Sequence, residues 1–182
     1  MAHVCPWWFV RSFDNPIRRR FHKPEEIFGA FVRPGMHVLD VGCGAGFNTV
    51  GLAQLVGPDG LVVGVDLQPR MLTMTKERLE GSGLLARAEL IQANARDLGL
   101  GTRPRFGFAT AFWMVHEVPD VERLFEQLRS VLERGAFVLI SEPKLHVSKR
   151  AFEASVQAGL RMGFEERDRP KIALSRSVVL VR

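Results

Sequence analysis

The chain has 182 residues, 46% of them hydrophobic, and a formal net charge of +5, which is enough material for the core of one ordinary domain. Its longest mainly apolar stretch, residues 106–115, is about half of the roughly 20 residues that a membrane-spanning helix needs, so no span is expected. The first residues lack a basic leader and a small-residue cleavage site. The two cysteines, Cys5 and Cys43, lack the spacing of a disulfide framework or a zinc site. A cytoplasmic location is therefore expected.

The positive charge gathers at the two ends of the chain. Residues 1–36 carry six Lys or Arg against three Asp or Glu, and residues 144–182 carry nine against four. Basic ends favour an anionic acceptor, a nucleic acid or a membrane surface through long-range attraction. An ordinary solvated surface explains the same pattern, so nucleic-acid binding stays an alternative that is not favoured.

One domain over residues 1–182 is expected, because no repeat, low-complexity tract or Gly/Ser linker divides the chain. Residues 1–36 form an expected N-terminal helical extension, with helix starts at Asn15-Pro16 and at Pro24, and residues 37–182 form the core. The extension can serve as a lid, with residues from Trp7 to Phe28 over the carboxyl ends of the strands, or it can pack on the domain or form a homodimer interface. The residues that could do so are five aromatic and three basic side chains: Trp7, Trp8, Phe9, Phe13, Phe21, Arg18, Arg19 and Arg20.

Strand and helix signals alternate beyond residue 36. Short, apolar, β-branched runs predict strands at residues 37–41, 61–66, 88–92, 106–112 and 136–141, with a closing pair at 164–168 and 177–181. Helices are predicted between them over residues 47–56, 69–81, 120–135 and 148–163, with Asp120 and Ser148 as caps of the last two. This order predicts an α/β fold: a doubly wound, Rossmann-like, mostly parallel seven-stranded sheet with a C-terminal antiparallel strand pair.

A glycine loop follows the first predicted strand. Gly42, Gly44 and Gly46 leave bare backbone against which a ligand can lie. A dinucleotide fingerprint that begins at Gly42 would require glycine at position 47, where Phe47 stands, and no lysine followed by Ser or Thr marks a triphosphate loop. Dinucleotide and triphosphate ligands are both disfavoured.

Asp66 ends the second predicted strand, twenty residues beyond Gly46. A carboxylate at this place can accept hydrogen bonds from both hydroxyls of a ribose. The glycine loop and this acid together indicate a ligand of the adenosine type.

The pattern Asp40-x-Gly42-x-Gly44-x-Gly46, followed by Gly64-Val65-Asp66, resembles class I S-adenosylmethionine-dependent methyltransferases over about residues 35–182. Residues 64–72 are similar to the ubiquinone/menaquinone-type, small-molecule branch of that class. The resemblance implies S-adenosylmethionine as cofactor. It also implies that Asp40 and the glycine loop hold the methionine portion, that Asp66 holds the ribose, and that Leu67 packs against adenine.

Members of that class often carry Gly-Asp-Ala after the third strand, where this chain has Ala93-Asn94-Ala95. The resemblance places Asn94 and Ala95 beside adenine, and the Asn94 amide oxygen can still accept a hydrogen bond. In the same class the end of the fourth strand faces the sulfonium, which adds Trp113 to the expected cofactor contacts.

His116 is the candidate catalytic residue, because it follows the same strand end and can deprotonate a hydroxyl or enol near neutral pH. A structural histidine at a helix start is the alternative. Methyl transfer from a sulfonium needs alignment and exclusion of water more than it needs a base. No metal is expected, because Trp113 and Met114 stand where catechol-type enzymes place ligands.

The acceptor is expected to be a small organic molecule that is methylated at oxygen or carbon. The Asp/Asn-Pro-Pro-aromatic sequence of amino-group methyltransferases is absent from the fourth strand end, and no cysteine stands where cytosine-carbon enzymes need one. Two alternatives stay open: an RNA methyltransferase that uses the basic ends, and a non-catalytic protein that binds S-adenosylmethionine for a partner enzyme.

Overall fold

The computed structural model describes residues 20–101, 103 and 105–182. Within this part the helices and strands alternate as the sequence predicts. The α-helices are α3 (Pro24–Phe28), α4 (Phe47–Leu55), α5 (Pro69–Gly81), α6 (Val121–Val131) and α7 (Lys149–Arg161). The strands are β1 (His37–Val41), β2 (Leu61–Asp66), β3 (Ala88–Gln92), β4 (Phe106–Phe112), β5 (Leu132–Pro143), β6 (Glu165–Asp168) and β7 (Ser175–Val181). Two short 3-10 helices, η1 (Leu85–Arg87) and η2 (Val115–Glu117), precede β3 and follow β4.

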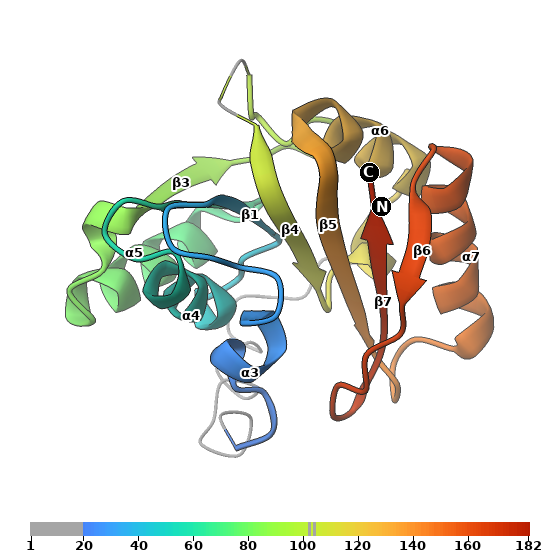
Figure 1. Cartoon of the computed structure of the whole chain (residues 1–182), viewed down its shortest axis with the longest axis horizontal. Helices are drawn as coiled ribbons and strands as arrows, with labels where there is room; N and C mark the ends of the chain where they lie inside the picture. Colours follow the sequence, from blue (N-terminus) through green and yellow to red (C-terminus); the bar gives the residue numbers. More distant parts are fainter. Residues whose placement is uncertain (1–19, 102, 104) are drawn as a thin grey trace.

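Seven strands of the described residues form one twisted sheet in the order β3-β2-β1-β4-β5-β7-β6 (Figure 1). β1 to β5 are parallel, whereas β7 runs antiparallel to both β5 and β6. This confirms the predicted Rossmann-like sheet with a C-terminal antiparallel pair. The strand order reverses at β1, whose neighbours are β2 and β4, and ligands bind at the carboxyl ends of the strands beside such a reversal.

Helices cover both faces of the sheet and bury an apolar cluster on each. The cluster under α3, α4 and α5 contains Phe28, Leu52 and Leu79. The cluster under α6 and α7 contains Phe125 and Val156. Because β1, β2 and β4 are covered on both sides, they are mostly apolar rather than alternating, as the sequence pattern indicates. None of the helices in the described residues combines the length and apolar character needed to cross a membrane.

The described part of the N-terminal extension belongs to the core. Phe28 is fully buried and Val32 is 3% exposed, and the Phe28 ring packs edge-on against Phe108 of β4 with the ring centroids 6.0 Å apart. The idea that the extension covers the strand ends from Trp7 as far as Phe28 is therefore wrong for Phe28, which lies under the sheet beside α4. The expectations for Asn15-Pro16 and for the aromatic and basic side chains before residue 20 lie outside the described residues.

One predicted boundary is also wrong. The helix expected to run to Gly135 ends at Val131, and β5 begins at Leu132, earlier than the predicted start at residue 136. Leu132 is already extended, with φ −80° and ψ 154°, and pairs with Phe106 of β4. An irregularity in the β4–β5 register between Phe106 and Phe108 accommodates the residues up to Gly135. The predicted caps are confirmed, because Asp120 accepts from the backbone N–H of Arg123 and Ser148 from that of Ala151.

Candidate functional site

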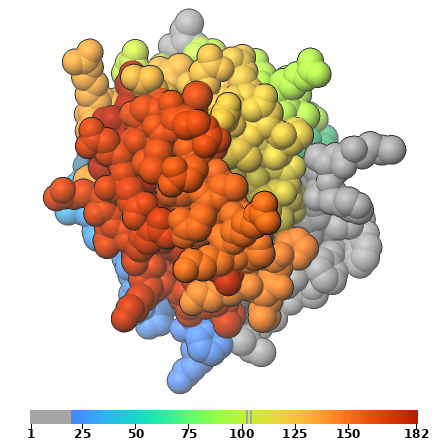
Figure 2. Space-filling view, turned by 90° about the vertical axis from the view of Figure 1, so that its right-hand side faces the viewer, coloured from blue at the N-terminus to red at the C-terminus, as the bar shows by residue number. Residues whose placement is uncertain are grey.

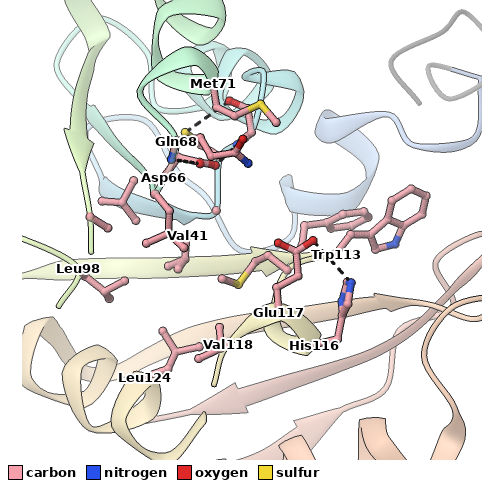
Figure 3. Close-up of a pocket in the computed structure, with 18 of the residues that line it drawn as sticks. Val41, Asp66, Gln68, Met71, Leu98, Trp113, His116, Glu117, Val118 and Leu124 are labelled. Atoms are coloured by element: carbon pink, nitrogen blue, oxygen red, sulfur yellow. Dashed lines mark hydrogen bonds and ion pairs between the residues drawn. The ribbon is translucent and has the colours of Figure 1, made fainter. Parts of the chain in front are cut away.

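A cavity of about 840 Å³ opens at the carboxyl ends of β1, β2 and β4. It has two ends, with Asp66 and Gln68 on one side and His116 and Glu117 on the other (Figure 3). Eight of the ten predicted site residues line it: Gly42, Gly44, Asp66, Leu67, Asn94, Ala95, Trp113 and His116. The sequence therefore predicts both ends of one pocket.

The glycine loop forms one wall of the cavity. Gly42 and Gly44 have positive φ angles of 68° and 55°, a region that side chains rarely adopt. A Cβ at Gly42 would lie 2.7 Å from the Met114 side chain, so this glycine allows the loop to pack against the end of β4. A Cβ at Gly44 would meet nothing within 4 Å. Gly44 therefore presents bare backbone to the cavity.

The Asp66 carboxylate holds this loop in place. Its Oδ2 accepts from the Gly44 N–H at 2.9 Å, and its Oδ1 accepts from the Gln68 N–H at 2.9 Å. Burial raises the pKa of Asp66, and backbone hydrogen bonds from Gln68, Gly44 and Leu67 oppose that rise. Each carboxylate oxygen has a second lone pair, so Asp66 can hold the loop and accept from a ligand hydroxyl at once.

Asn94 and Ala95 line the cavity on the β3 side. The Asn94 side-chain oxygen accepts from the Arg96 N–H at 2.9 Å, and the Asn94 backbone pairs with Asp97. This turn fixes the Asn94 amide at the edge of the cavity, where the oxygen keeps one lone pair for a ligand donor.

Asp40 and Gly46 do not line the cavity. The Asp40 carboxylate is 1% exposed and accepts from the Thr49 hydroxyl of α4 at 2.7 Å, which fixes β1 to α4 behind the loop. Gly46 lies against α5, where an added Cβ would approach Thr75 to 2.8 Å. Both residues shape the loop from behind.

Cys43 also borders the cavity. Burial raises the pKa of its thiol well above the ordinary value, and the charges of Asp40 and Asp66 raise it further. A thiol that stays protonated is a poor nucleophile.

Trp113 lies at the start of the opposite wall of the cavity, and its backbone conformation is strained. Its φ is 61°, which is rare for a bulky aromatic residue. The Trp113 N–H donates to the Ser141 carbonyl at 2.7 Å and its indole N–H donates to the Ser175 hydroxyl at 2.9 Å. Contacts with β5 and β7 therefore hold the indole beside the cavity.

His116 is held by a carboxylate that the sequence reasoning missed. Its Nδ1 lies 2.5 Å from the Oε2 of Glu142, whose other oxygen accepts from the Val115 N–H at 2.7 Å. Its Nε2 lies 3.9 Å from the Oε1 of Glu117, and its ring lies edge-on to His146 with centroids 4.9 Å apart. Burial lowers the pKa of His116, but the hydrogen bond to Glu142 and the charges of Glu142 and Glu117 outweigh burial and raise the pKa above its ordinary value.

Glu142 could have been found from the predicted topology. It is 1% exposed near the carboxyl end of β5, and β5 is the parallel neighbour of β4, which leads to His116. Residues that follow or end adjacent parallel strands lie at one edge of the sheet. Within the described residues, no group of three or more His, Cys, Asp or Glu side chains is placed to hold a metal ion.

The sheet order and the cavity at its carboxyl edge define a Rossmann-like α/β ligand-binding domain. The chain belongs to the methyltransferase-domain family, whose sequence pattern matches residues 38–135. It is 34% identical over 111 residues to the demethylmenaquinone methyltransferase of Bacillus cytotoxicus, a match that covers 61% of this chain and 46% of that protein. It is 31% identical over 137 residues to the ubiquinone/menaquinone biosynthesis C-methyltransferase UbiE of Shewanella frigidimarina, covering 74% of this chain and 54% of that protein.

The chain thus spans about half the length of the curated relatives that it matches. A solved structure of nearly the same extent is a SAM-dependent methyltransferase from Aquifex aeolicus, which superposes with a TM-score of 0.85 at 23% identity and covers 97% of this chain and 98% of its own. That likeness supports the fold.

Proposed function

We propose that the protein transfers a methyl group from S-adenosylmethionine to a small aromatic acceptor that carries an ionisable hydroxyl, at carbon or oxygen. One observation carries the proposal: a single cavity joins the open glycine loop and Asp66 to a histidine that is held by a buried carboxylate. The first end fits an adenosine ligand and the second end fits proton transfer. The membership of the methyltransferase-domain family supports this assignment.

The residues at the first end fit the cofactor. Gly44 offers backbone without a side chain, Asp66 has lone pairs for two ribose hydroxyls, and the partly exposed Leu67 gives an apolar surface for adenine. When bound, S-adenosylmethionine supplies a methyl group on a positively charged sulfur, which leaves as a neutral thioether. The protein's own task is then to align the acceptor and to remove a proton from it.

His116 performs the proton transfer in this proposal. Its Nδ1–H donates to Glu142, so its Nε2 carries the lone pair that takes the acceptor's hydroxyl proton. The raised pKa of His116 makes it a stronger base for this step. Loss of the proton leaves the oxygen, and the ring carbons conjugated with it, electron-rich enough to attack the methyl carbon. After attack at a ring carbon, that carbon loses its proton, which makes the ring aromatic again.

Apolar side chains around His116 favour an aromatic acceptor. Phe112, Trp113, Val118, Leu145 and Leu174 line this end of the cavity. The matched relatives are named for methylation of demethylmenaquinone and for ubiquinone/menaquinone biosynthesis. We therefore place a hydroquinone-type ring beside His116, with its hydroxyl toward Nε2.

Calorimetry with S-adenosylmethionine and a methylation assay on a panel of hydroquinones test the proposal. Asp66→Ala should weaken cofactor binding about ten- to a hundredfold, because it removes charge-assisted ribose contacts. Asp59→Ala, an exposed acid in the turn before β2, is the control and should bind normally. Unchanged binding in a folded Asp66→Ala protein would refute the placement of the cofactor. Binding without methylation of any acceptor would favour a non-catalytic partner.

Alanine substitutions at Gly44 and Gly135 distinguish an effect on cofactor binding in the cavity from an effect on backbone strain. Gly44 and Gly135 both have positive φ and both have open space around an added Cβ, but Gly135 lies at the other end of β5. Alanine at either position should cost about 1 kcal/mol of stability. Only Gly44→Ala should also reduce cofactor affinity. Equal affinity in the two variants would contradict the proposed contact with the loop.

A further inference from the structure

Exposed apolar side chains gather beside the mouth of the cavity. Leu145 is 96% exposed, Leu174 is 55% exposed and Phe21 is 52% exposed, whereas most large apolar side chains of the described residues are covered. Leu145 and Leu174 also line the cavity. Large apolar side chains grouped at the entrance of a pocket mark a surface that meets an apolar partner.

Two hydrogen bonds bring these side chains to one edge of the molecule. The backbone N–H of Lys144 donates to the Leu174 carbonyl at 2.9 Å, which joins the β5–α7 loop to the β6–β7 loop. The His22 Nε2 lies 2.7 Å from the Ala173 carbonyl oxygen, which brings the residue after Phe21 to the residue before Leu174. Figure 1 shows both loops at the lower edge of the sheet, and Figure 2 shows the start of the described chain, in blue, at the same edge.

Leu174 is placed there at a cost to the backbone. Its φ is 58°, and it is one of two non-glycine residues at positive φ in the described chain, the other being Trp113 of the cavity wall. A leucine in this conformation is strained, and glycine or asparagine would relieve the strain. Its exposed side chain adds little to the core, so the strain points to a function at the surface.

Basic side chains surround the apolar ones. Lys144, Lys149, Lys171 and Arg176 line a second hollow that borders the same two loops. The three lysines are exposed and form no salt bridge with an acid in the described part of the chain, although the charge of Lys149 lowers the pKa of Glu153, which lines the same hollow. Arg176 donates to the carbonyls of Lys144 and Val147, which joins the β5–α7 loop to β7. This edge therefore carries an excess of positive charge next to exposed leucines.

We propose that these seven side chains, hereafter the rim, dock the protein on the surface of an anionic phospholipid bilayer: Phe21, Leu145 and Leu174 enter the interface, and Lys144, Lys149, Lys171 and Arg176 contact the lipid phosphates. Stable binding of a protein to a bilayer takes two signals, and an apolar insertion with a polybasic patch supplies both. A nucleic acid would use the cations but would gain little from exposed leucines. The combination favours the lipid surface.

Docking through the rim turns the mouth of the cavity toward the bilayer. Leu145 and Leu174 belong both to the rim and to the cavity, so an apolar acceptor can pass from lipid to His116 without crossing water. This consequence rests on the proposed function, whereas binding to lipid does not. The two can therefore be tested separately.

Co-sedimentation of the full chain with vesicles, without cofactor or acceptor, tests the proposal. Wild-type protein should sediment with phosphatidylcholine vesicles that contain phosphatidylglycerol and should stay largely unbound with phosphatidylcholine alone. Lys171→Glu should weaken binding about fivefold or more, and Leu145→Ser about tenfold. Arg134→Glu makes the same charge reversal at the opposite end of β5 and should bind as wild type.

Failure of the wild type to bind anionic vesicles overturns the proposal, as does equal weakening by Lys171→Glu and Arg134→Glu. Salt-sensitive binding to single-stranded RNA that Lys171→Glu weakens, with Leu145→Ser neutral, would assign the rim to nucleic acid instead. Calorimetry with S-adenosylmethionine on the same preparations keeps the proposed function separate, because cofactor binding should be normal in the Lys171→Glu and Arg134→Glu proteins.

Discussion

The interaction between His116 and Glu142 predicts how turnover depends on pH. The raised pKa of His116 means that its base form dominates only above the pH at which a free histidine loses its proton. Turnover should therefore rise with pH through that raised pKa. Glu142→Gln removes the charge that opposes the effect of burial on the pKa of His116, so the rising limb of the plot of kcat against pH should move to lower pH while kcat falls.

His116→Ala should lower kcat by about 10² to 10⁴ and leave cofactor affinity nearly unchanged.

The interaction between His116 and Glu142 also predicts how the stability of the protein depends on pH. A histidine whose pKa is higher in the folded protein than in the unfolded chain makes its full contribution to stability below its pKa in the unfolded chain. This contribution is lost as the pH rises through its pKa in the folded protein. Glu142→Gln should therefore lose more stability at about pH 6 than at about pH 9. Glu117→Gln is the control, because its carboxylate lies 3.9 Å from the ring and should shift the profile less. An unchanged pH dependence of stability in Glu142→Gln would contradict the role of Glu142 in raising the pKa of His116.

Local sequence patterns predict the limits of most strands, but pairing within the sheet determines the α6–β5 boundary. The predicted strand limits at residues 37–41, 61–66, 88–92 and 106–112 agree with the structure because each strand is a short apolar run closed by turn residues. The α6–β5 boundary was missed because a helical pattern of apolar residues continues to Leu132, where pairing with β4 extends the backbone. Likewise the direction of the Asp40 side chain, toward α4, follows from packing that no motif contains.

α3 gives a test of where the extension ends and the core begins. Phe28 is fully buried among side chains of β4 and α4, whereas Phe21 is half exposed. Phe28→Ala should lower the free energy of unfolding by about 3 to 5 kcal/mol, because it removes a buried ring and leaves a cavity. Phe21→Ala should change it by less than about 1 kcal/mol. Chemical denaturation measures both, and comparable losses would contradict the assignment of α3 to the core.

The composition of the chain does not predict how charge is distributed over the folded protein. The basic excess of residues 144–182 divides into two groups. Arg161 and Arg169 form salt bridges with acids, at 2.7 Å to Glu122 and at 2.5 Å to Glu153. The cations of the rim form no salt bridge among the described residues and leave an excess of positive charge beside the cavity. The sequence predicts the excess and the possibility of an anionic partner. Only the fold separates the charges that neutralise each other from those that face outward.

The proposed reaction requires that water is excluded from the cavity, which would hold both acceptor and cofactor. The β5–α7 connection is short, and its Leu145 points into solvent, so the described loops give the His116 end little cover. We infer that residues before Pro24 supply the cover, as lids do in other enzymes. His22 is 1% exposed and its ring packs edge-on against Phe112 and Trp113, with centroids 5.4 and 5.1 Å away, so the chain enters the fold beside the cavity.

Deletion of residues 1–23 tests this inference, because it removes the proposed cover and keeps α3, which begins at Pro24. The shortened protein should fold, should bind S-adenosylmethionine more weakly, and should fail to methylate its acceptor, since water then reaches the reacting atoms. His22→Ala in the full chain is the matched control: it removes a single buried side chain and keeps the rest of the segment, so it should weaken turnover and not abolish it. Circular dichroism, calorimetry and the methylation assay separate the outcomes. Normal turnover by the shortened protein would assign the preceding aromatic residues to packing or association, and failure to fold would assign them to the core.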